Sequence, residues 1–202
     1  MRILLSIYLL IGLPALAEGP VTLLVQTQAG EAIPNAVVIA KDSEAEVSAD
    51  SFDWDVLMEQ SDKTFVPYVL IAPLGSEVSF PNRDRMRHHV YSFSKGNRFE
   101  IELYGRDETR SIAFDTPGVV AVGCNIHDEM IGYIRVVDTP YAGKTDGAGS
   151  MTFTDLPAGT NEFLVWHPDM SERDDVVISW NGASELKVTL DVAPAALAAG
   201  NH

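Results

Sequence analysis

Short runs of apolar residues, separated by breaks rich in Gly, Pro, Asn and Asp, cover most of the chain. In several runs apolar and polar positions alternate, as they do in a strand that is buried on one face. No amphipathic run is long enough to predict a helix. Short strands at even spacing, with turn residues between them, are typical of β-sandwiches. We therefore predict an all-β fold.

The expected strands extend over the whole chain after an N-terminal apolar stretch. We expect strands at 21–25, 36–40, 68–71, 77–80, 88–93, 99–103, 111–114, 119–122, 132–137, 150–154, 162–166, 175–179 and 186–190. The residues that follow the N-terminal stretch, about 185 in all, are enough to bury one large core or two small ones.

The N-terminus has the pattern of a secretory signal peptide. Arg2 precedes an apolar run at 3–13, and the sequence Ala-Leu-Ala follows at 15–17. The run is too short to span a bilayer alone. We expect residues 1–17 to be removed by cleavage after Ala17, and an uncleaved anchor is the alternative. No later segment is apolar enough to cross a membrane, so we expect a soluble periplasmic or secreted protein that does not contact the membrane after cleavage.

The formal net charge of -15 limits the partners of the chain. Such a surface repels nucleic acid and anionic lipid, and it favours basic partners or solubility alone. Acidic residues concentrate between 42 and 62, and we predict an acidic linker at 46–63. The C-terminal residues 193–202 are predicted to be a flexible tail.

Cys124 is the single cysteine of the chain. Secreted proteins of this size usually have none, or an even number in disulfides. A lone thiol in an oxidising compartment is a liability unless it is buried or bound to a metal. Cys124 is therefore the first residue whose chemistry needs an explanation.

Cys124 begins the pattern C-x-x-H-x-x-M, which His127 and Met130 complete. A thiolate, a thioether and two imidazoles are the ligands of blue-copper sites. We expect the three side chains to converge from a loop between the strands at 119–122 and 132–137, since a regular strand sends alternate side chains to opposite faces.

Other interpretations of this pattern remain open. Taken singly, Cys124 could be a buried core thiol, His127 a surface loop residue and Met130 a core residue. Zinc also accepts Cys and His ligands. Met130 is the weakest member of the set, because another group can take the place of an axial thioether. A catalytic Cys–His pair would need an exposed, reactive thiolate.

The second imidazole must come from upstream, where His88 and His89 are adjacent. Neighbouring strand residues face opposite ways, so we expect one of the two to enter the site, and parity alone does not say which. Asn82 and Asp84 are predicted to hold the loop before them by hydrogen bonds from side chains to backbone.

The segment 64–138 resembles cupredoxins. It contains F-x-P at 65–67, G-x-x-V-x-F-x-N-x-D at 75–84, and His88 at the first position of the cupredoxin H-N-V run, with His89 in place of the Asn. The spacing before Met130 resembles the compact plastocyanin- and amicyanin-like copper loops. The resemblance implies a Greek-key β-sandwich that binds one type 1 copper ion through His88, Cys124, His127 and Met130.

The longer strings GCNIHDEMIGYI and HHVYSFSKGNRFEIELY resemble periplasmic cupredoxin-like proteins often labelled methylamine utilisation proteins. The flanks, 18–45 and 139–192, resemble the two halves of a carboxypeptidase regulatory-like domain. They contain VTLLVQTQAGEAIPNAVVIA at 21–40 and KTDGAGSMTFTDLPAGTNEFLVW at 144–166. This resemblance implies an additional small transthyretin-like β-sandwich formed by both flanks. The alternative is that the flanks complete the cupredoxin barrel.

These resemblances, together with the ligand types, predict a periplasmic electron carrier rather than an enzyme. The copper would cycle between Cu(II) and Cu(I), and electrons would pass through His127 to a periplasmic redox partner such as a cytochrome or dehydrogenase. The alternative is a copper-delivery protein, or an interaction module with structural copper. The chain has only six Met and five His, without the dense clusters that delivery proteins use.

Overall fold

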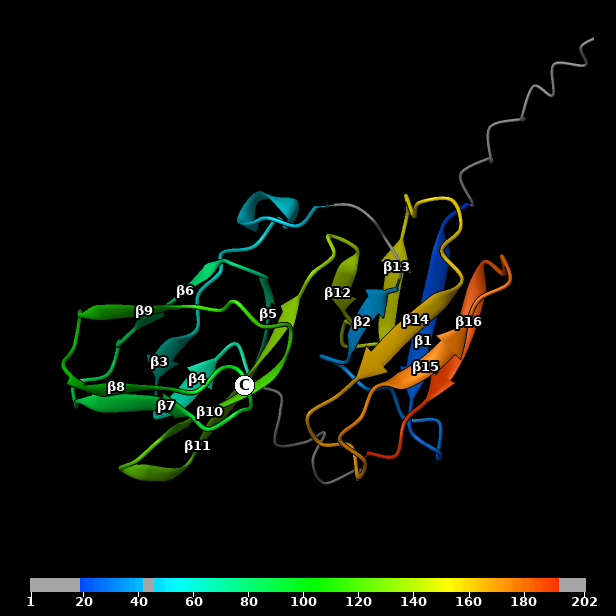
Figure 1. The fold of residues 1–202 in the computed structure, drawn as a ribbon. Helices are drawn as coiled ribbons and strands as arrows, with labels where there is room; N and C mark the ends of the chain where they lie inside the picture. Colours follow the sequence, from blue (N-terminus) through cyan, green and yellow to red (C-terminus); the bar gives the residue numbers. More distant parts are fainter. Residues whose placement is uncertain (1–18, 42–45, 193–202) are drawn as a thin grey trace, which may run out of the picture.

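The computed structural model describes residues 19–41 and 46–192 (Figure 1). The predicted signal peptide at 1–17 and the predicted tail at 193–202 lie outside the described residues. Within the described ranges, no helix is long and apolar enough to cross a membrane.

Regular structure in the described ranges is almost entirely strand. The only helical element there is the short 3-10 turn η1 (Ala49–Ser51). The strands are β1 (Val21–Gln26), β2 (Val37–Ala40), β3 (Glu59–Ser61), β4 (Thr64–Val66), β5 (Val69–Pro73), β6 (Glu77–Pro81), β7 (His88–Ser92), β8 (Phe99–Tyr104), β9 (Thr109–Ala113), β10 (Gly118–Cys124), β11 (His127–Val137), β12 (Ala142–Lys144), β13 (Ser150–Phe153), β14 (Glu162–Trp166), β15 (Val176–Ser179) and β16 (Glu185–Thr189).

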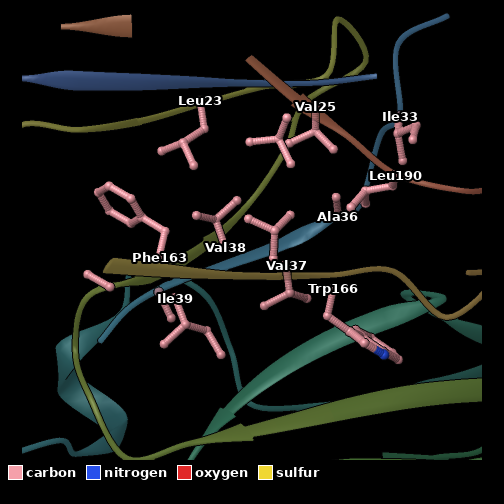
Figure 2. Close-up of a cluster of buried hydrophobic side chains, with 14 of the residues drawn as sticks. Leu23, Val25, Ile33, Ala36, Val37, Val38, Ile39, Phe163, Trp166 and Leu190 are labelled. Atoms are coloured by element: carbon pink, nitrogen blue, oxygen red, sulfur yellow. The ribbon is translucent and has the colours of Figure 1, made fainter. Parts of the chain in front are cut away.

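The flanking sandwich contains β1, β2 and β12 to β16, so both ends of the described chain contribute to it (Figure 1). One sheet has the order β13-β1-β16, in which β1 is antiparallel to β13 and parallel to β16. The other has the order β12-β2-β14-β15. Leu23 and Val25 of β1 face Val38 and Phe163 across the core between the sheets (Figure 2).

The central sandwich contains β3 to β11. Its main sheet has the order β5-β11-β10-β7-β8, and the pairs β6-β9 and β3-β4 cover the inner face of that sheet. Isolated bridges, Leu57 to Ser79 and Gln60 to Asn82, connect the two pairs. The core between these layers includes Phe65, Phe80 and Cys124.

The two sandwiches pack directly against each other. Every residue of β2 and of β5 is buried, because each of these strands is covered on both faces where the two sandwiches meet. In β5, Val69 and Ile71 join the flanking core, whereas Leu70 and Ala72 join the central core. In Figure 2, Ile39 and Trp166 point away from β1, toward the central sandwich.

This architecture confirms the predicted all-β fold, in which the flanks form a second sandwich beside the central one. The alternative, in which the flanks complete the central barrel, does not match the strand pairing, because β1 pairs only with β13 and β16 among the named strands.

The segment 46–63, expected as an acidic linker, is more than a connection. It contains β3, which pairs antiparallel with β4, and it buries Met58 and Gln60 completely. Its acidic residues lie in exposed or half-buried positions. The sequence pattern therefore indicates a solvated segment, although Met58 and Gln60 enter the core. Strands β3, β4 and β12 were not expected, since three-residue strands leave little periodicity in a sequence.

Candidate metal centre

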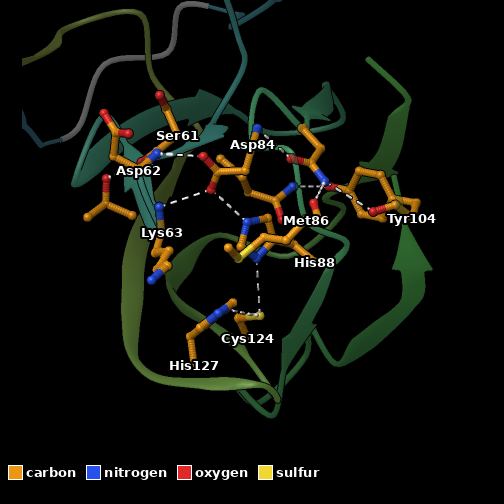
Figure 3. A network of polar contacts seen from close by, with 12 residues as sticks. Ser61, Asp62, Lys63, Asp84, Met86, His88, Tyr104, Cys124 and His127 are labelled. Carbon is orange, nitrogen blue, oxygen red and sulfur yellow. Dashed lines mark hydrogen bonds and ion pairs between the residues drawn. The ribbon is translucent and has the colours of Figure 1, made fainter. Parts of the chain in front are cut away.

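Three strand ends bring the candidate ligands together. His88 is the first residue of β7, Cys124 is the last of β10, and His127 is the first of β11 (Figure 3). One donor atom from each of these side chains lies within 4.8 Å of the other two. His88 and Cys124 are buried, whereas His127 is half-exposed. The cluster therefore lies at one end of the central core, with one imidazole reaching the surface.

A tight hairpin with a bulge positions Cys124 and His127. The two residues are directly paired, and only Asn125 and Ile126 lie between the strands. The neighbouring pair is Gly123 with Ile131, so the segment 128–130 has no partner residues on β10. The loop expected between 122 and 132 is thus mostly strand, since β11 begins at His127 rather than Gly132. The bulge, instead of a long loop, breaks the strict alternation of side chains.

The distances between donors fit a metal site. The Sγ atom of Cys124 lies 3.8 Å from Nδ1 of His88 and 3.8 Å from Nδ1 of His127. With metal–sulfur and metal–nitrogen bonds of about 2.3 and 2.0–2.1 Å, ligands in a trigonal arrangement are about 3.8 Å apart, and ligands in a tetrahedral one about 3.6 Å. Both separations are compatible with a single metal ion held by two imidazoles and one thiolate, which belong to the ligand set of blue copper.

Asp84 holds the ring of His88 in place. Its Oδ2 lies 2.7 Å from Nε2 of His88, which leaves Nδ1 directed at Cys124 (Figure 3). The carboxylate also accepts hydrogen bonds from the backbone N–H groups of Asp62 and Lys63, at 2.8 and 2.9 Å. Burial acts to raise the pKa of Asp84, but the Lys63 N–H, the His88 ring and the Asp62 N–H together hold that pKa below its usual value.

Asn82 organises the loop that leads to His88. Its Nδ2 donates to the carbonyl groups of Met86 and Tyr104, and its Oδ1 accepts from the N–H of Asp84. The predicted role of Asn82 and Asp84 in fastening this loop is therefore confirmed by the hydrogen bonds. In addition, Asp84 contacts the ring of His88 itself, as carboxylates commonly do behind metal-bound imidazoles.

His89 lies outside the cluster. Its Nε2 is 3.0 Å from Oε1 of Glu100, and its ring packs against Tyr91. His88 and His89 thus take opposite faces of β7, as the parity of a strand requires. The structure brings His88, rather than His89, to Cys124 and His127.

Met130 lies on the bulged part of β11 and is 1% exposed. It belongs to the same core cluster as Cys124. The side chain of Met130 is thus buried in the apolar core of the central sandwich, to which Cys124 also belongs. The neighbouring residues Asp128 and Glu129 are exposed.

A hairpin that the sequence did not indicate supports this site. Asp62 and Lys63 form its two-residue turn, both with positive φ, at 52° and 62°. Such a turn is usually marked by Asn-Gly or Asp-Gly, so Asp-Lys gives no clear signal. Next to it, Gln60 and Tyr104 form a buried hydrogen bond, and the Tyr104 hydroxyl donates to the carbonyl of Phe80 at 2.8 Å. Burial raises the pKa of Tyr104 to about 12.

Comparison with known proteins adds a partial structural likeness. No family model matches the chain, and no curated protein matches it. A copper-containing nitrite reductase from Thermus scotoductus is 27% identical at a TM-score of 0.40, covering 47% of this chain and 26% of that one. A purple cupredoxin from Nitrosopumilus maritimus is 20% identical at a TM-score of 0.38, covering 41% of this chain and all of that one.

A mutant of amicyanin in its reduced Cu(I) form is 20% identical at a TM-score of 0.39, covering 51% of this chain and 99% of the amicyanin chain. The solved structures that resemble part of this chain therefore include cupredoxins.

Proposed function

We propose that this chain is a periplasmic type 1 copper protein that carries electrons and is not an enzyme. The observation that supports this proposal best is the convergence of two imidazole Nδ1 atoms on the sulfur of Cys124, each at 3.8 Å, in a largely buried site held by strand ends. With Met130 as a fourth ligand, the donor set suits copper better than zinc, because zinc is held by Cys, His and carboxylate groups rather than by a thioether.

Each residue has a distinct part in this function. Cys124 supplies the thiolate, and Met130 would be the weak axial ligand from the adjoining core. Asp84 fixes the tautomer and orientation of His88, so that its ring stays in position when the charge of the site changes. When bound, the copper supplies a centre that accepts and releases one electron.

His127 is the proposed route for electrons, because it is the one half-exposed ligand. Its neighbour Ile126 is 51% exposed, which gives the surface beside the imidazole an apolar character. The partner would be a periplasmic redox protein such as a cytochrome or dehydrogenase. The periplasmic location rests on the signal peptide expected at 1–17.

The test is the visible absorption spectrum of the mature protein after addition of Cu(II). We expect an intense thiolate-to-copper charge-transfer band that ascorbate bleaches and that is absent from Cys124→Ser. A colourless protein that still binds metal would contradict the proposal and favour structural zinc. A coloured protein that gives up copper rapidly to a chelator would favour delivery instead.

Adjacent histidines provide a matched control. His88→Gln should lose the band, whereas His89→Gln should keep it, because only His88 lies in the donor cluster. Equal spectra from the two variants would contradict the proposed ligand set.

A further inference from the structure

A pocket of about 240 Å³ lies where the two sandwiches meet, and it shares no residue with the metal centre. The segment before β3 contributes Trp54, Asp55 and Leu57 to its wall. Pro67 comes from the turn between β4 and β5, and β5 contributes Leu70 and Ile71. Lys144, the last residue of β12, comes from the flanking sandwich. The lining is therefore apolar except for one carboxylate and one amine.

The amine of Lys144 is incompletely satisfied. Its Nζ donates one hydrogen bond, of 2.7 Å, to the carbonyl of Val69. Within the described residues no carboxylate pairs with this amine, Asp55 included. Burial lowers the pKa of Lys144, and no neighbouring charge opposes that effect. Lys144 is half-buried, so its ammonium has lost part of its hydration without gaining a counter-ion, and this is less favourable than full exposure to water.

The indole of Trp54 is already satisfied at its polar end. Its Nε1 donates to the carbonyl of Ile71 at 3.1 Å, so the ring offers the pocket apolar surface and no free donor. The free hydrogen-bond donors of the pocket thus lie at Lys144, and a carboxylate would supply both the charge and the acceptors that Nζ lacks.

We propose that this pocket binds a small monoanionic carboxylate with an apolar ring or short chain, whose carboxylate pairs with Lys144. The volume is below the range of pockets for drug-sized ligands, so the apolar part must be small. Asp55 on the same wall disfavours a second negative charge on the ligand. This inference does not depend on the proposed copper function.

The test compares benzoate with its neutral analogue benzamide by calorimetric titration of the metal-free mature chain. Benzoate should bind saturably, and benzamide should bind about tenfold more weakly or worse, because a charge-assisted hydrogen bond is lost. Equal affinity for the two probes, or no saturable binding of benzoate, would overturn the proposal. This comparison needs no variant, so it holds even where a substitution impairs folding.

Two lysine variants then locate the contact. Lys144→Met should weaken benzoate binding by about tenfold or more, whereas Lys187→Met, an exposed position on β16, should leave it unchanged. Circular dichroism should show both variants folded. Unchanged benzoate binding in a folded Lys144→Met variant would overturn the assignment. Because copper is absent throughout, the result is independent of the spectrum that tests the metal centre.

Discussion

The two sandwiches use buried polar side chains for different purposes. In the flanking sandwich, Thr145 Oγ1 donates to the carbonyl of Ile33 and accepts from the N–H of Ala36, at 2.7 and 2.9 Å, so its hydrogen bonds close on the backbone. In the central sandwich, the network of Asn82 and Asp84 ends at a His88 ring whose other nitrogen is directed at a thiol. A buried hydrogen-bond network therefore supports a candidate metal site where it leaves one ring nitrogen, Nδ1 of His88, without a hydrogen bond to the network.

The sandwiches also differ in how much they depend on each other. The β2–β14 sheet is covered by β1 on one face and by the central sandwich on the other, whereas the candidate metal ligands lie at the ends of three strands. A ring contact between Tyr133 and Trp166, at 6.0 Å between centroids, crosses the boundary. We therefore expect damage to the flanking core to reach the central sandwich.

The largest expected effect comes from Phe163→Ala in the flanking core. Phe163 is completely buried and stacks on Phe153 with ring centroids 5.6 Å apart. Removing such a ring leaves a cavity and lowers the free energy of unfolding by about 3–5 kcal/mol. Because the sandwiches share a core, urea unfolding followed by circular dichroism and by tryptophan fluorescence should remain one transition with a lower midpoint.

Val177→Ala is the control, since Val177 lies on neighbouring β15 and is 54% exposed. It should change the midpoint little. Two separate transitions in Phe163→Ala would show that the sandwiches unfold independently, and the dependence described above would then be wrong.

Arg135→Met should produce the next largest effect. Arg135 of β11 pairs with Asp175 at 2.7 Å across the boundary, and the Arg135 side chain is 10% exposed. Removing one partner leaves the other charge poorly solvated, so we expect a loss of about 3 kcal/mol in the free energy of unfolding. Urea midpoints measure this loss, and Arg83→Met, in the exposed pair with Glu59, should cost much less.

The double variant Arg135→Met with Asp175→Leu sharpens this result. Nε of Arg135 and Oδ1 of Asp175 have no hydrogen-bond partner among the residues that the structure describes, so the pair is incompletely satisfied. Replacing both charges by apolar side chains should restore most of the stability. A double variant as unstable as Arg135→Met would mean that packing, rather than the unpaired charge, causes the loss.

Asp84→Asn tests the network at the metal centre. The carboxylate accepts from the Asp62 N–H with one oxygen, and from His88 and the Lys63 N–H with the other. An amide has a single oxygen and cannot serve both sides, so the His88 ring should lose its fixed orientation. We expect the affinity for Cu(I), measured by competition with a chelator, to fall by about 10- to 100-fold.

Asp62→Asn is the matched control for Asp84→Asn. It removes one negative charge from the turn between β3 and β4, and the Asp62 side chain does not bond to the ring of His88. Only the backbone of Asp62 contacts Asp84, and Asn tolerates the positive φ of that position. Its copper affinity should stay near that of the unsubstituted protein. An equal loss in the two variants would indicate a general charge effect.

The sequence predicts those parts of the fold and site that depend on local pattern. Cys124 and His127 are close in sequence, and a metal site is visible in their spacing. His88 could be preferred over His89 only through the resemblance to cupredoxins, since parity alone allows either. The β3–β4 turn at Asp62 and Lys63 lacks the usual turn residues, and its contacts to Asp84 join segments 21 and 22 residues apart.

The packing of one sandwich on the other was beyond prediction for a different reason. Lys144 reads as an ordinary polar residue of a turn, and its burial depends on where β5 and Trp54 lie in space. Periodicity describes one strand at a time, whereas the pocket and the shared core depend on which sheets cover each other.

The smallest expected effect concerns His167, which follows β14 in the flanking sandwich and is 4% exposed. Burial lowers the pKa of His167, and the nearby Asp169 only partly opposes this effect. The unfolded chain takes up this proton near about pH 6.5, and the folded protein does so only at lower pH. The unfolded state thus binds more protons below about pH 6.5, and stability falls as the pH decreases toward the folded pKa.

His167→Gln removes this one contribution and leaves the other histidines in place. Its free energy of unfolding, from urea midpoints at several pH values between about 5 and 8, should decrease less steeply below about pH 6.5 than that of the unsubstituted protein. Above that pH the two curves should run parallel, offset by the lost hydrogen bond from the Asp169 N–H to Nδ1 of His167. Parallel curves over the whole range would mean that His167 takes up its proton equally well in the folded and unfolded states, and burial in the flanking sandwich would then have no electrostatic consequence.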